Sequence, residues 1–521
     1  MRMIRIALIG VPVCCAALVP APAVAVDRSA GAAVPKPVAS GAPWSEAEIA
    51  SLSANVDLAL AGAKTLRGAH VGLLAVDARE GRVLYQRAAD DAFQPASTLK
   101  LLTGSAALDK LGPDYRLTTE VVAGGPVEDG VLRGELLLRG GGDPFLSAAD
   151  LAAAADAVAK AGIVRVSSGV AVDDARHERA ASLPGWSVDD VPYPYAAPIS
   201  ALSLEQNVVH VTVSPGASAG APAIVRAGPG TEVGRSIEGC APTVRVRIVP
   251  AAVTGPPGAK DTVDFTRERS GCIVVTGTIP AGAQPDMLDA AVVSPAVYAH
   301  DVFAAALRAR GVVVVQPEPL AAPWPWEYRS GTPPSPAART LWRHDSEPLR
   351  DLLGELWIPS DNLLAELLLR ELGLAQSGAP GTTANGIAVE TGWLRALGAD
   401  TTASLALEDG SGLSAYDRIT PRALVAILAH DWNGPYRELV LDDLPIAGVR
   451  GTLKSAFAGT AAERAVFAKT GTLSHVSALA GYAANARHGA VIFAFTVDDW
   501  TGDAGDLRET RGRVLSLFVT S

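Results

Sequence analysis

Three short motifs in the chain carry residues that together could acylate a serine without a histidine base. Ser97 stands three residues before Lys100, Ser360 stands two residues before Asn362, and Lys469 begins a Lys-Thr-Gly triplet. Lys100 is the only one of the eight lysines that has a serine three residues before it, and the triplet occurs once. Each motif alone is a weak signal. The three in this order predict a serine enzyme that attacks an amide.

The first motif supplies a nucleophile and a base. A serine hydroxyl is a poor nucleophile until a neighbouring group takes its proton. Residues i and i+3 share one face of a helix, so Lys100 can bring its amine to the Ser97 oxygen. A lysine acts as a base only when burial or a second cation lowers its pKa, and Lys469 is the candidate cation. Taken alone, Ser97 could equally be a helix cap and Lys100 a solvated surface residue.

The other two motifs suit proton relay and substrate binding. Ser360 fits a relay between Lys100 and the leaving amine, and Asn362 offers a donor and an acceptor for a substrate amide. The backbone N–H groups of Ser97 and Thr472 would form an oxyanion hole. We expect the third motif to hold a substrate carboxylate and, at its glycine, to let the substrate backbone lie close. Its residues are Lys469, Thr470, Gly471 and Thr472.

The first 25 residues have the pattern of a signal peptide. Arg2 and Arg5 form a basic start, the run over residues 4–19 is apolar apart from Arg5, and a small-x-small cleavage site ends at Ala25. A membrane anchor is the competing interpretation, but the run is short for one. We predict cleavage after Ala25, a flexible leader over residues 26–43, and export to a periplasm-like space, the cell wall or the medium.

The composition limits the partners and cofactors. The formal net charge of -11 argues against nucleic acid. No later apolar run is long enough to span a bilayer, so we expect at most peripheral membrane contact. The eight histidines are scattered without a His-Glu-x-x-His pattern, and we expect no metal and no cofactor. Cys240 and Cys272 would remain after cleavage, either as a disulfide, which an oxidising compartment favours, or as two free thiols.

The spacing of apolar residues and the positions of Pro/Gly-rich turns divide the mature chain into three regions, for which we predict an α/β fold. Residues 118–286 carry short alternating apolar segments, Pro/Gly-rich turns and one Ala-rich helix near 148–162, and we predict inserted β-rich domains there. Residues 44–117 and 287–521 would form the two parts of one catalytic domain.

Local patterns predict how this domain carries the motifs. A helix begins near Ser97, and helical spacing surrounds Ser360. The other expected elements are a helix from Ser45, strands over 71–76 and 82–87, helical structure from Leu288, a hairpin of 478–484 with 490–497, and a helix near 503–519.

The three motifs resemble the signature of penicillin-binding proteins and serine β-lactamases. The closer resemblance is to D-alanyl-D-alanine carboxypeptidase/endopeptidases, the type-4 penicillin-binding proteins, and it runs from about Ser45 to the C-terminus. Further segments carry it: Gly140-Gly-Gly-Asp143-Pro144, Asp409-Gly-Ser411-Gly-Leu413-Ser414, Gly451-Thr-Leu453, Ala468-Lys-Thr-Gly-Thr-Leu473 and Ser477-Ala-Leu-Ala-Gly481-Tyr482.

The resemblance implies a fold and an activity. The fold would be an antiparallel sheet flanked by helices, with the insertion forming two extra domains. The enzyme would act on peptidoglycan stem peptides ending in D-Ala-D-Ala through an acyl-enzyme on Ser97. It would be a carboxypeptidase, would cleave some peptide cross-links as a DD-endopeptidase, and would be acylated by β-lactam antibiotics. Ser411 and Leu413 would line its cleft.

One segment departs from the resemblance. Relatives often place a basic residue directly after the Asp-Gly-Ser-Gly-Leu-Ser segment, where this chain has Ala415. Arg418 is the candidate substitute in recognition of a carboxylate on the substrate side chain. Asp190 and Tyr195 are candidates for the border of the same pocket.

Three other interpretations stay open. A serine β-lactamase would share the nucleophile but deacylate fast, and a non-catalytic wall-binding protein would form no covalent adduct. An α/β-hydrolase is suggested by Gly216-Ala-Ser218-Ala-Gly220, but Pro215 precedes this segment and a strand-like stretch follows it, so we expect a loop. His475 is expected to be a turn or strand residue rather than a base.

Overall fold

The structure, a computed structural model, describes residues 34–234, 245–268, 271–315, 338–402 and 404–521. The predicted signal peptide and the start of the predicted leader lie outside these residues. So does Cys240, while Cys272 is buried and disulfide-bonded. Within the described residues, no helix combines the length and apolar character that a membrane span requires.

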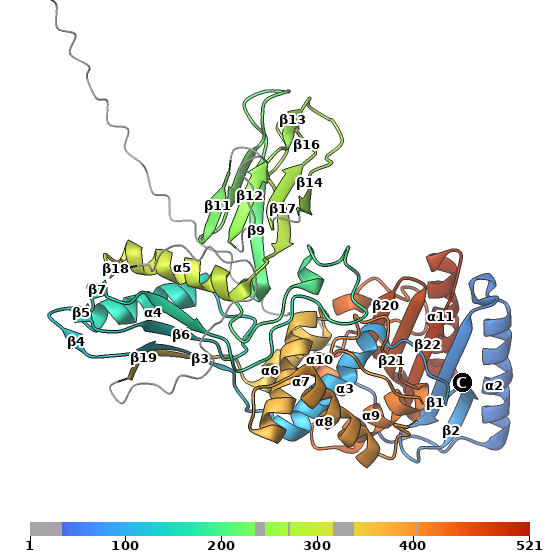
Figure 1. Cartoon of the computed structure of the whole chain (residues 1–521). Coiled ribbons are helices and arrows are strands. Elements are labelled where there is room, and N and C mark those ends of the chain that lie inside the picture. The colour runs from blue at the N-terminus through green and yellow to red at the C-terminus, as the bar shows by residue number, and fades with distance from the viewer. Residues whose placement is uncertain (1–33, 235–244, 269–270, 316–337, 403) are drawn as a thin grey trace, which may run out of the picture.

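A five-stranded antiparallel sheet forms the centre of the catalytic domain, in the order β2-β1-β22-β21-β20. Both ends of the chain supply strands to it, so the two predicted parts of the domain meet in one sheet (Figure 1). The α/β fold and the antiparallel sheet are confirmed. The bounds are β1 (His70–Asp77), β2 (Val83–Arg87), β20 (Val466–Leu473), β21 (Val476–Asn485) and β22 (Gly489–Asp498).

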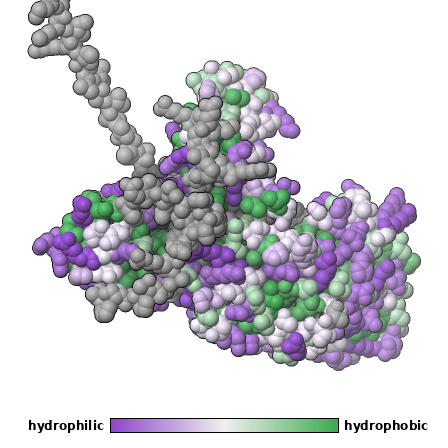
Figure 2. Space-filling model, viewed as in Figure 1, coloured by the Kyte–Doolittle hydropathy of each residue, from purple (hydrophilic) through white to green (hydrophobic). Residues whose placement is uncertain are grey.

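Two helices cover one face of this sheet, and their apolar residues pack with it in one core. Helix α2 begins after Ser45, whose side chain accepts from the backbone of Glu48 in a capping box. Its buried positions Leu52, Val56 and Leu60 recur every fourth residue, which is the spacing of one helix face. Figure 2 shows hydrophilic residues over the outer side of this end of the molecule. The two helices are α2 (Glu46–Ala61) and α11 (Ala504–Thr520).

Six helices form a second layer on the opposite face, around a separate core (Figure 1). This layer carries two of the three motifs, because α3 begins at Lys100 and α7 begins at Asn362. The helices are α3 (Lys100–Leu111), α6 (Leu349–Trp357), α7 (Asn362–Ser377), α8 (Thr383–Ala396), α9 (Pro421–Asn433) and α10 (Arg437–Asp443).

The inserted region forms two lobes that share a continuous apolar core. In the first lobe, two four-stranded sheets, β18-β7-β5-β4 and β19-β3-β6-β8, lie with α4 and α5. Their bounds are β3 (Thr118–Ala123), β4 (Val127–Glu128), β5 (Val131–Leu132), β6 (Leu136–Arg139), α4 (Ala148–Lys160), β7 (Arg165–Val166), β8 (Val170–Asp173), α5 (Pro295–Ala309), β18 (Val313–Val314) and β19 (Arg339–Asp345).

The second lobe stands upright in Figure 1, and the regular elements of its described residues are strands. Its sheets are β10-β9-β17, β11-β12-β15-β14 and β13-β16. The bounds are β9 (Val208–Ser214), β10 (Ile224–Ala227), β11 (Thr231–Val233), β12 (Val246–Pro250), β13 (Val253–Gly255), β14 (Asp264–Arg267), β15 (Ile273–Thr276), β16 (Thr278–Pro280) and β17 (Asp286–Ala291).

The insertion extends further along the chain than the predicted boundary at residue 286. Strand β17 pairs with β9, so helical structure begins at Pro295 rather than at Leu288. Helix α5 packs in the inserted core, and β19 pairs with β3. The prediction was wrong here because helical spacing shows that a segment has an apolar face but not which core receives that face.

Residues 34–43 of the predicted flexible leader lie against the turn between β21 and β22. The backbone of Ala42 donates to Arg487 at 2.9 Å, and Ala490 donates to Val38 at 2.9 Å. The Pro/Gly/Ala-rich composition predicts a flexible leader, whereas these hydrogen bonds attach this part of it to the catalytic domain. Composition does not reveal that extended backbone can still find hydrogen-bond partners on a neighbouring turn.

Candidate active site

The first motif lies where a short 3-10 helix, η2 (Ala96–Leu99), passes into α3. The Lys100 amine donates to Ser97 Oγ at 2.8 Å, as the i, i+3 spacing predicts. Ala96 has a φ of 44°, a left-handed conformation that is costly for a residue with a Cβ. Such strain persists where the surrounding structure enforces it, and here it turns the chain directly before Ser97.

Lys100 is completely buried and makes three hydrogen bonds. Besides Ser97, its amine donates to Asn362 Oδ1 at 2.5 Å and to the backbone oxygen of Ser411 at 2.8 Å. Burial lowers the pKa of Lys100 to about 8. Three carboxylates oppose that effect, those of Asp409, Asp361 and Glu366. Burial is therefore the main cause that prepares this lysine to act as a base near neutral pH, and repulsion between its charge and that of Lys469 acts in the same direction.

Lys469 on the edge strand β20 is equally buried but has other partners. Its amine donates to Ser360 Oγ at 2.8 Å and to the backbone oxygen of Thr470 at 2.9 Å. Burial, together with the charge of Lys100, lowers the pKa of Lys469 well below its usual value. The structure thus joins Ser360 to Lys469, where the sequence led us to expect Lys100.

The second motif marks the start of α7. Ser360 has a φ of 74°, a strained conformation for serine. Asp361 caps the helix, accepting from the backbone of Leu364 at 2.7 Å. The amide of Asn362 is fixed at both ends, because Oδ1 accepts from Lys100 and Nδ2 donates to the backbone oxygen of Tyr195 at 2.7 Å. One Nδ2 hydrogen remains for a substrate carbonyl.

The third motif packs directly against the first. A Cβ on Gly471 would lie 2.5 Å from the Pro95 oxygen and 3.0 Å from the Ser97 nitrogen. The glycine therefore lets the nucleophile turn approach β20. That it also lets the substrate backbone lie close stays a prediction. Thr470 donates to Thr452 at 2.7 Å, and Thr472 is exposed.

Two buried acids hold the Asp-Gly-Ser-Gly-Leu-Ser segment against Lys100. Asp409 accepts from the backbones of Gly412 at 2.6 Å and Ser414 at 2.7 Å. Glu366 accepts from the backbone of Ser411 at 2.9 Å. These bonds point the Ser411 oxygen at the Lys100 amine. Leu413 is partly buried at the same turn.

The role of Glu366 was missed from the sequence. The available signal was an acid one turn after Asn362 inside an otherwise apolar helix, since a charge on a buried face is normally paired. Burial, followed by the nearby Asp409 charge, raises the pKa of Glu366 to about 7.

The loop that carries Asp190 and Tyr195 borders the site. The Tyr195 hydroxyl donates to Asp190 at 2.9 Å, and its backbone oxygen reaches Asn362. Trp186 on the same loop donates to Asp409 at 2.8 Å, a contact that the sequence analysis did not predict. Arg418 donates to the backbone of Ala415 at 2.9 Å.

Other residues considered from the sequence lie elsewhere. Ser218 is in the loop between β9 and β10, as expected, and His475 is in the turn between β20 and β21 with a φ of 60°. Among the described residues, no three His, Cys, Asp or Glu side chains are grouped to hold a metal ion.

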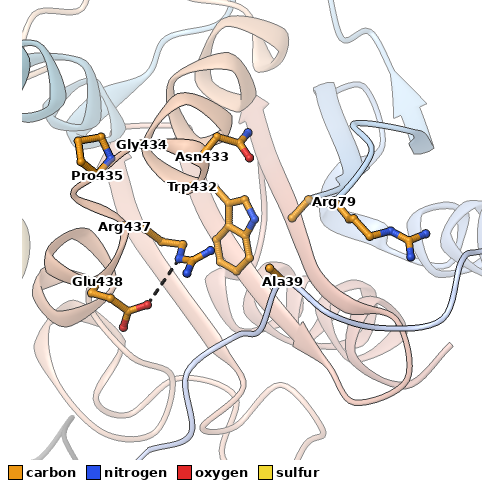
Figure 3. A pocket seen from close by; sticks show the side chains of 9 residues that line it. Ala39, Arg79, Trp432, Asn433, Gly434, Pro435, Arg437 and Glu438 are labelled. Carbon is orange, nitrogen blue, oxygen red and sulfur yellow. Dashed lines mark ion pairs between the residues drawn. The ribbon is translucent and has the colours of Figure 1, made fainter.

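A pocket of about 400 Å³ lies apart from the motifs (Figure 3). Arg437 extends over the ring of Trp432, 5.2 Å from its centroid, and pairs with Glu438. None of the three motifs lines this pocket. It is therefore distinct from the site around Ser97.

Comparison with known proteins gives a family match and several relatives. Residues 52–516 match the sequence model of the D-Ala-D-Ala carboxypeptidase 3 (S13) family. A D-alanyl-D-alanine carboxypeptidase of Actinomadura sp. (strain R39) is 36% identical over 452 residues, covering 84% of this chain and 79% of the relative. The D-alanyl-D-alanine carboxypeptidase DacB of Haemophilus influenzae is 25% identical, covering 86% of this chain and 90% of the relative.

A solved structure shares the fold. The crystal structure of penicillin binding protein 4 (dacB) from Haemophilus influenzae superposes with a TM-score of 0.72 at 22% identity. The match covers 89% of this chain and 97% of that chain. The insertion is therefore part of the shared architecture and not an addition particular to this chain.

Proposed function

The chain belongs to the D-Ala-D-Ala carboxypeptidase 3 (S13) family and is a serine-type D-alanyl-D-alanine carboxypeptidase, and we propose that its acyl-enzyme forms on Ser97. The observation that carries this proposal is the 2.8 Å hydrogen bond from the buried Lys100 amine to Ser97 Oγ. The substrate is a peptidoglycan stem peptide that ends in D-Ala-D-Ala.

In the acylation step, Ser97 Oγ attacks the carbonyl carbon between the two D-alanines while Lys100 takes its proton. The negative charge on the substrate oxygen is held by the backbone N–H groups of Ser97 and Thr472, a role worth about 3–4 kcal/mol per donor in such sites. Because Ser360 Oγ accepts from Lys469, its own proton is free for the leaving amine, and the proton that Lys100 took from Ser97 replaces it on Ser360, which leaves Lys100 neutral for the next step. The C–N bond then breaks, and D-alanine leaves.

In the deacylation step, water replaces the amine. Lys100 removes a proton from the water, which attacks the ester, and the Ser97–carbonyl bond breaks. Ser97 regains its proton as the shortened peptide leaves. Each step conserves protons, because the one that Lys100 takes returns to the serine or to the leaving group.

The substrate carboxylate fits the end of the site formed by Lys469, Thr470 and Thr472. A β-lactam presents an amide and a carboxylate and would acylate Ser97 by the same route. The proposal extends to peptide cross-links with the same terminal geometry, and to export of the mature chain, which the signal-peptide pattern supports.

Intact mass measurement after brief exposure to benzylpenicillin tests the nucleophile. We expect one adduct on the wild type and none on Ser97→Ala, together with D-alanine release from a stem pentapeptide by the wild type only. Ser218→Ala is the matched control, because this serine lies in a loop of the insertion, and it should retain both activities. An adduct on Ser97→Ala, or its loss from Ser218→Ala, would contradict the proposal.

A further inference from the structure

A strained turn of the insertion touches the second motif. Glu205, Gln206 and Asn207 have φ values of 49°, 54° and 59°, so three consecutive residues with side chains adopt the left-handed conformation. That conformation is disfavoured for residues other than glycine and is normally visited one residue at a time. A run of three persists only where its surroundings enforce it, which makes the turn a candidate functional element.

The outer residues of the turn are held by the insertion itself. Glu205 accepts from the backbone of Ala148, at the start of α4, at 2.8 Å. Asn207 is fully buried and donates to the backbone oxygen of Pro198 at 2.8 Å. The backbone of Gln206 donates to Pro144 at 2.8 Å. These bonds fix the turn, and the Gln206 side chain remains exposed on the side of the catalytic domain.

The Gln206 side chain meets the motif at its centre. Its amide nitrogen donates to Asp361 Oδ2, while the other oxygen of Asp361 caps α7 through Leu364. Strand β9 begins directly after this turn, at the junction of the insertion with the catalytic domain (Figure 1). Asp361 stands between Ser360 and Asn362, so its carboxylate sets where the chain leaves the strained Ser360 and enters the helix.

We infer that Gln206 is a positioning residue for acylation: the insertion uses its side-chain amide to hold Asp361, and through Asp361 the side chains of Ser360 and Asn362. The inference rests on the proposed acyl-enzyme at Ser97. It gives the insertion a function in catalysis in addition to its place in the fold. It also accounts for the strained backbone conformations on both sides of the contact between Gln206 and Asp361, at residues 205–207 and at Ser360.

Charge adds to this positional effect. The Gln206 hydrogen bond favours the ionised form of Asp361, whose pKa burial raises. The Asp361 charge acts on Lys100 alongside the charges of Asp409 and Glu366, and Lys469 faces Lys100 from β20. Loss of the amide would therefore disturb both the position of Asp361 and the charge near the base.

The variant Gln206→Gly distinguishes the effect of the side-chain hydrogen bond from the effect of the backbone strain. Glycine accepts a φ of 54° without strain, so the melting temperature should stay the same or rise. The rate of acylation by benzylpenicillin should fall about three- to tenfold, because a hydrogen bond to a carboxylate is lost at a partly exposed position. Asp129→Gly is the matched control, since Asp129 has a φ of 47° in the exposed β4–β5 turn. It should relieve strain and leave the acylation rate unchanged.

Gln206→Glu supplies a readout that a purely structural role would not change. The introduced carboxyl has the shape of the amide and lies against Asp361, with Glu205 beside it and Lys100 beyond. When protonated it can donate to Asp361, and when ionised it repels Asp361. The ratio of its acylation rate to that of the wild type should therefore rise as the pH falls from 8 to about 5.

Several outcomes would overturn the inference. Wild-type acylation rates in Gln206→Gly, or a rate ratio for Gln206→Glu that is constant across the pH range, would show that Gln206 does not position the motif. An equal loss of acylation in Asp129→Gly would assign the effect to the insertion in general. Absence of a wild-type adduct would instead refute the acyl-enzyme itself and this inference with it.

Discussion

The two lysines of the candidate active site are both completely buried, yet their surroundings differ in charge. Lys100 has three carboxylates acting on it, and burial still lowers its pKa to about 8. Lys469 faces the charge of Lys100 without such compensation, and its pKa is lowered well below the usual value. Burial sets the direction of both shifts, and the neighbouring carboxylates decide how far each goes.

This difference suggests a division of labour. Lys100 can lose and regain a proton near neutral pH, which is what a general base needs. Among the described residues, no carboxylate acts on Lys469 as three do on Lys100. A substrate carboxylate bound beside Thr470 would supply one and favour its charged form. The acids behind Lys100 belong to the protein, whereas the acid for Lys469 would arrive with the substrate.

The largest effect should come from removal of the base. Lys100→Met keeps an unbranched side chain of similar length and removes the amine next to Ser97. Acylation by benzylpenicillin should slow by about 10²- to 10⁴-fold, the contribution typical of a general base. Stopped-flow or intact-mass kinetics measure this rate, and circular dichroism checks the fold. Acylation within tenfold of the wild type would assign the base elsewhere.

Removal of the second lysine should cost less and act more on binding. Lys469→Met removes the donor to Ser360 and the cation beside Thr470. We expect the specificity constant for a stem peptide to fall about tenfold to a hundredfold, the value of a charged hydrogen bond, with a larger share of the loss in KM than for Lys100→Met. A greater loss of acylation than in Lys100→Met would reverse the two roles.

A smaller effect should follow when one of the acids behind Lys100 becomes neutral. Acylation needs neutral Lys100, so the wild-type rate should rise with pH through about pH 8. Glu366 is ionised there, because its own pKa is about 7, and its charge raises the pKa of Lys100. Glu366→Gln should therefore move the rise in rate to lower pH, by roughly one unit or less.

Glu390→Gln is the matched control for that shift. Glu390 is buried in α8, and burial raises its pKa well above the usual value, whereas the carboxylates that act on Lys100 are those of Asp409, Asp361 and Glu366. Its replacement should leave the pH profile of acylation in place. Equal profiles for Glu366→Gln and the wild type would show that the acids behind Lys100 do not set its pKa.

The sequence contained most of the fold and the ordered motifs, because both depend on local signals. The cap at Ser45, the strands β1 and β2, the hairpin of β21 and β22, and the helix after Ser97 follow from spacing and capping residues alone. The predicted boundary at residue 286 was wrong, because the packing of α5 and the pairing of β19 depend on contacts with residues that are distant in the sequence.

Most of the side-chain contacts within the site also could not be predicted from local sequence patterns. The i, i+3 contact of Lys100 with Ser97 was predictable. The contact of Lys469 with Ser360 joins residues 109 positions apart, and that of Gln206 with Asp361 spans 155. The reason for Gly471 also lies in another segment, the turn at Pro95 and Ser97. Such contacts depend on how helices, strands and turns pack against one another, and a short stretch of sequence does not determine that packing.

The smallest effect on the reaction should come from replacement of Asp431, an acid that is buried in the same helical layer as Glu366 and whose hydrogen-bond partner is a serine. Burial raises the pKa of Asp431 to about 8, and Ser105 donates to it at 2.7 Å. Between about pH 4 and pH 8 the folded state therefore keeps a proton that the unfolded state has lost, so this group's contribution to stability falls as the pH rises. Asp431→Asn removes that dependence. The melting temperature of the variant should rise relative to that of the wild type from pH 4 to 8, and its unfolding free energy should gain roughly 1.4 kcal/mol per pH unit at most.

Acylation should stay within twofold of the wild type. Parallel curves of melting temperature against pH would mean that Asp431 ionises normally in the fold, and that a buried acid here does not need a lysine such as Lys100 to keep its charge.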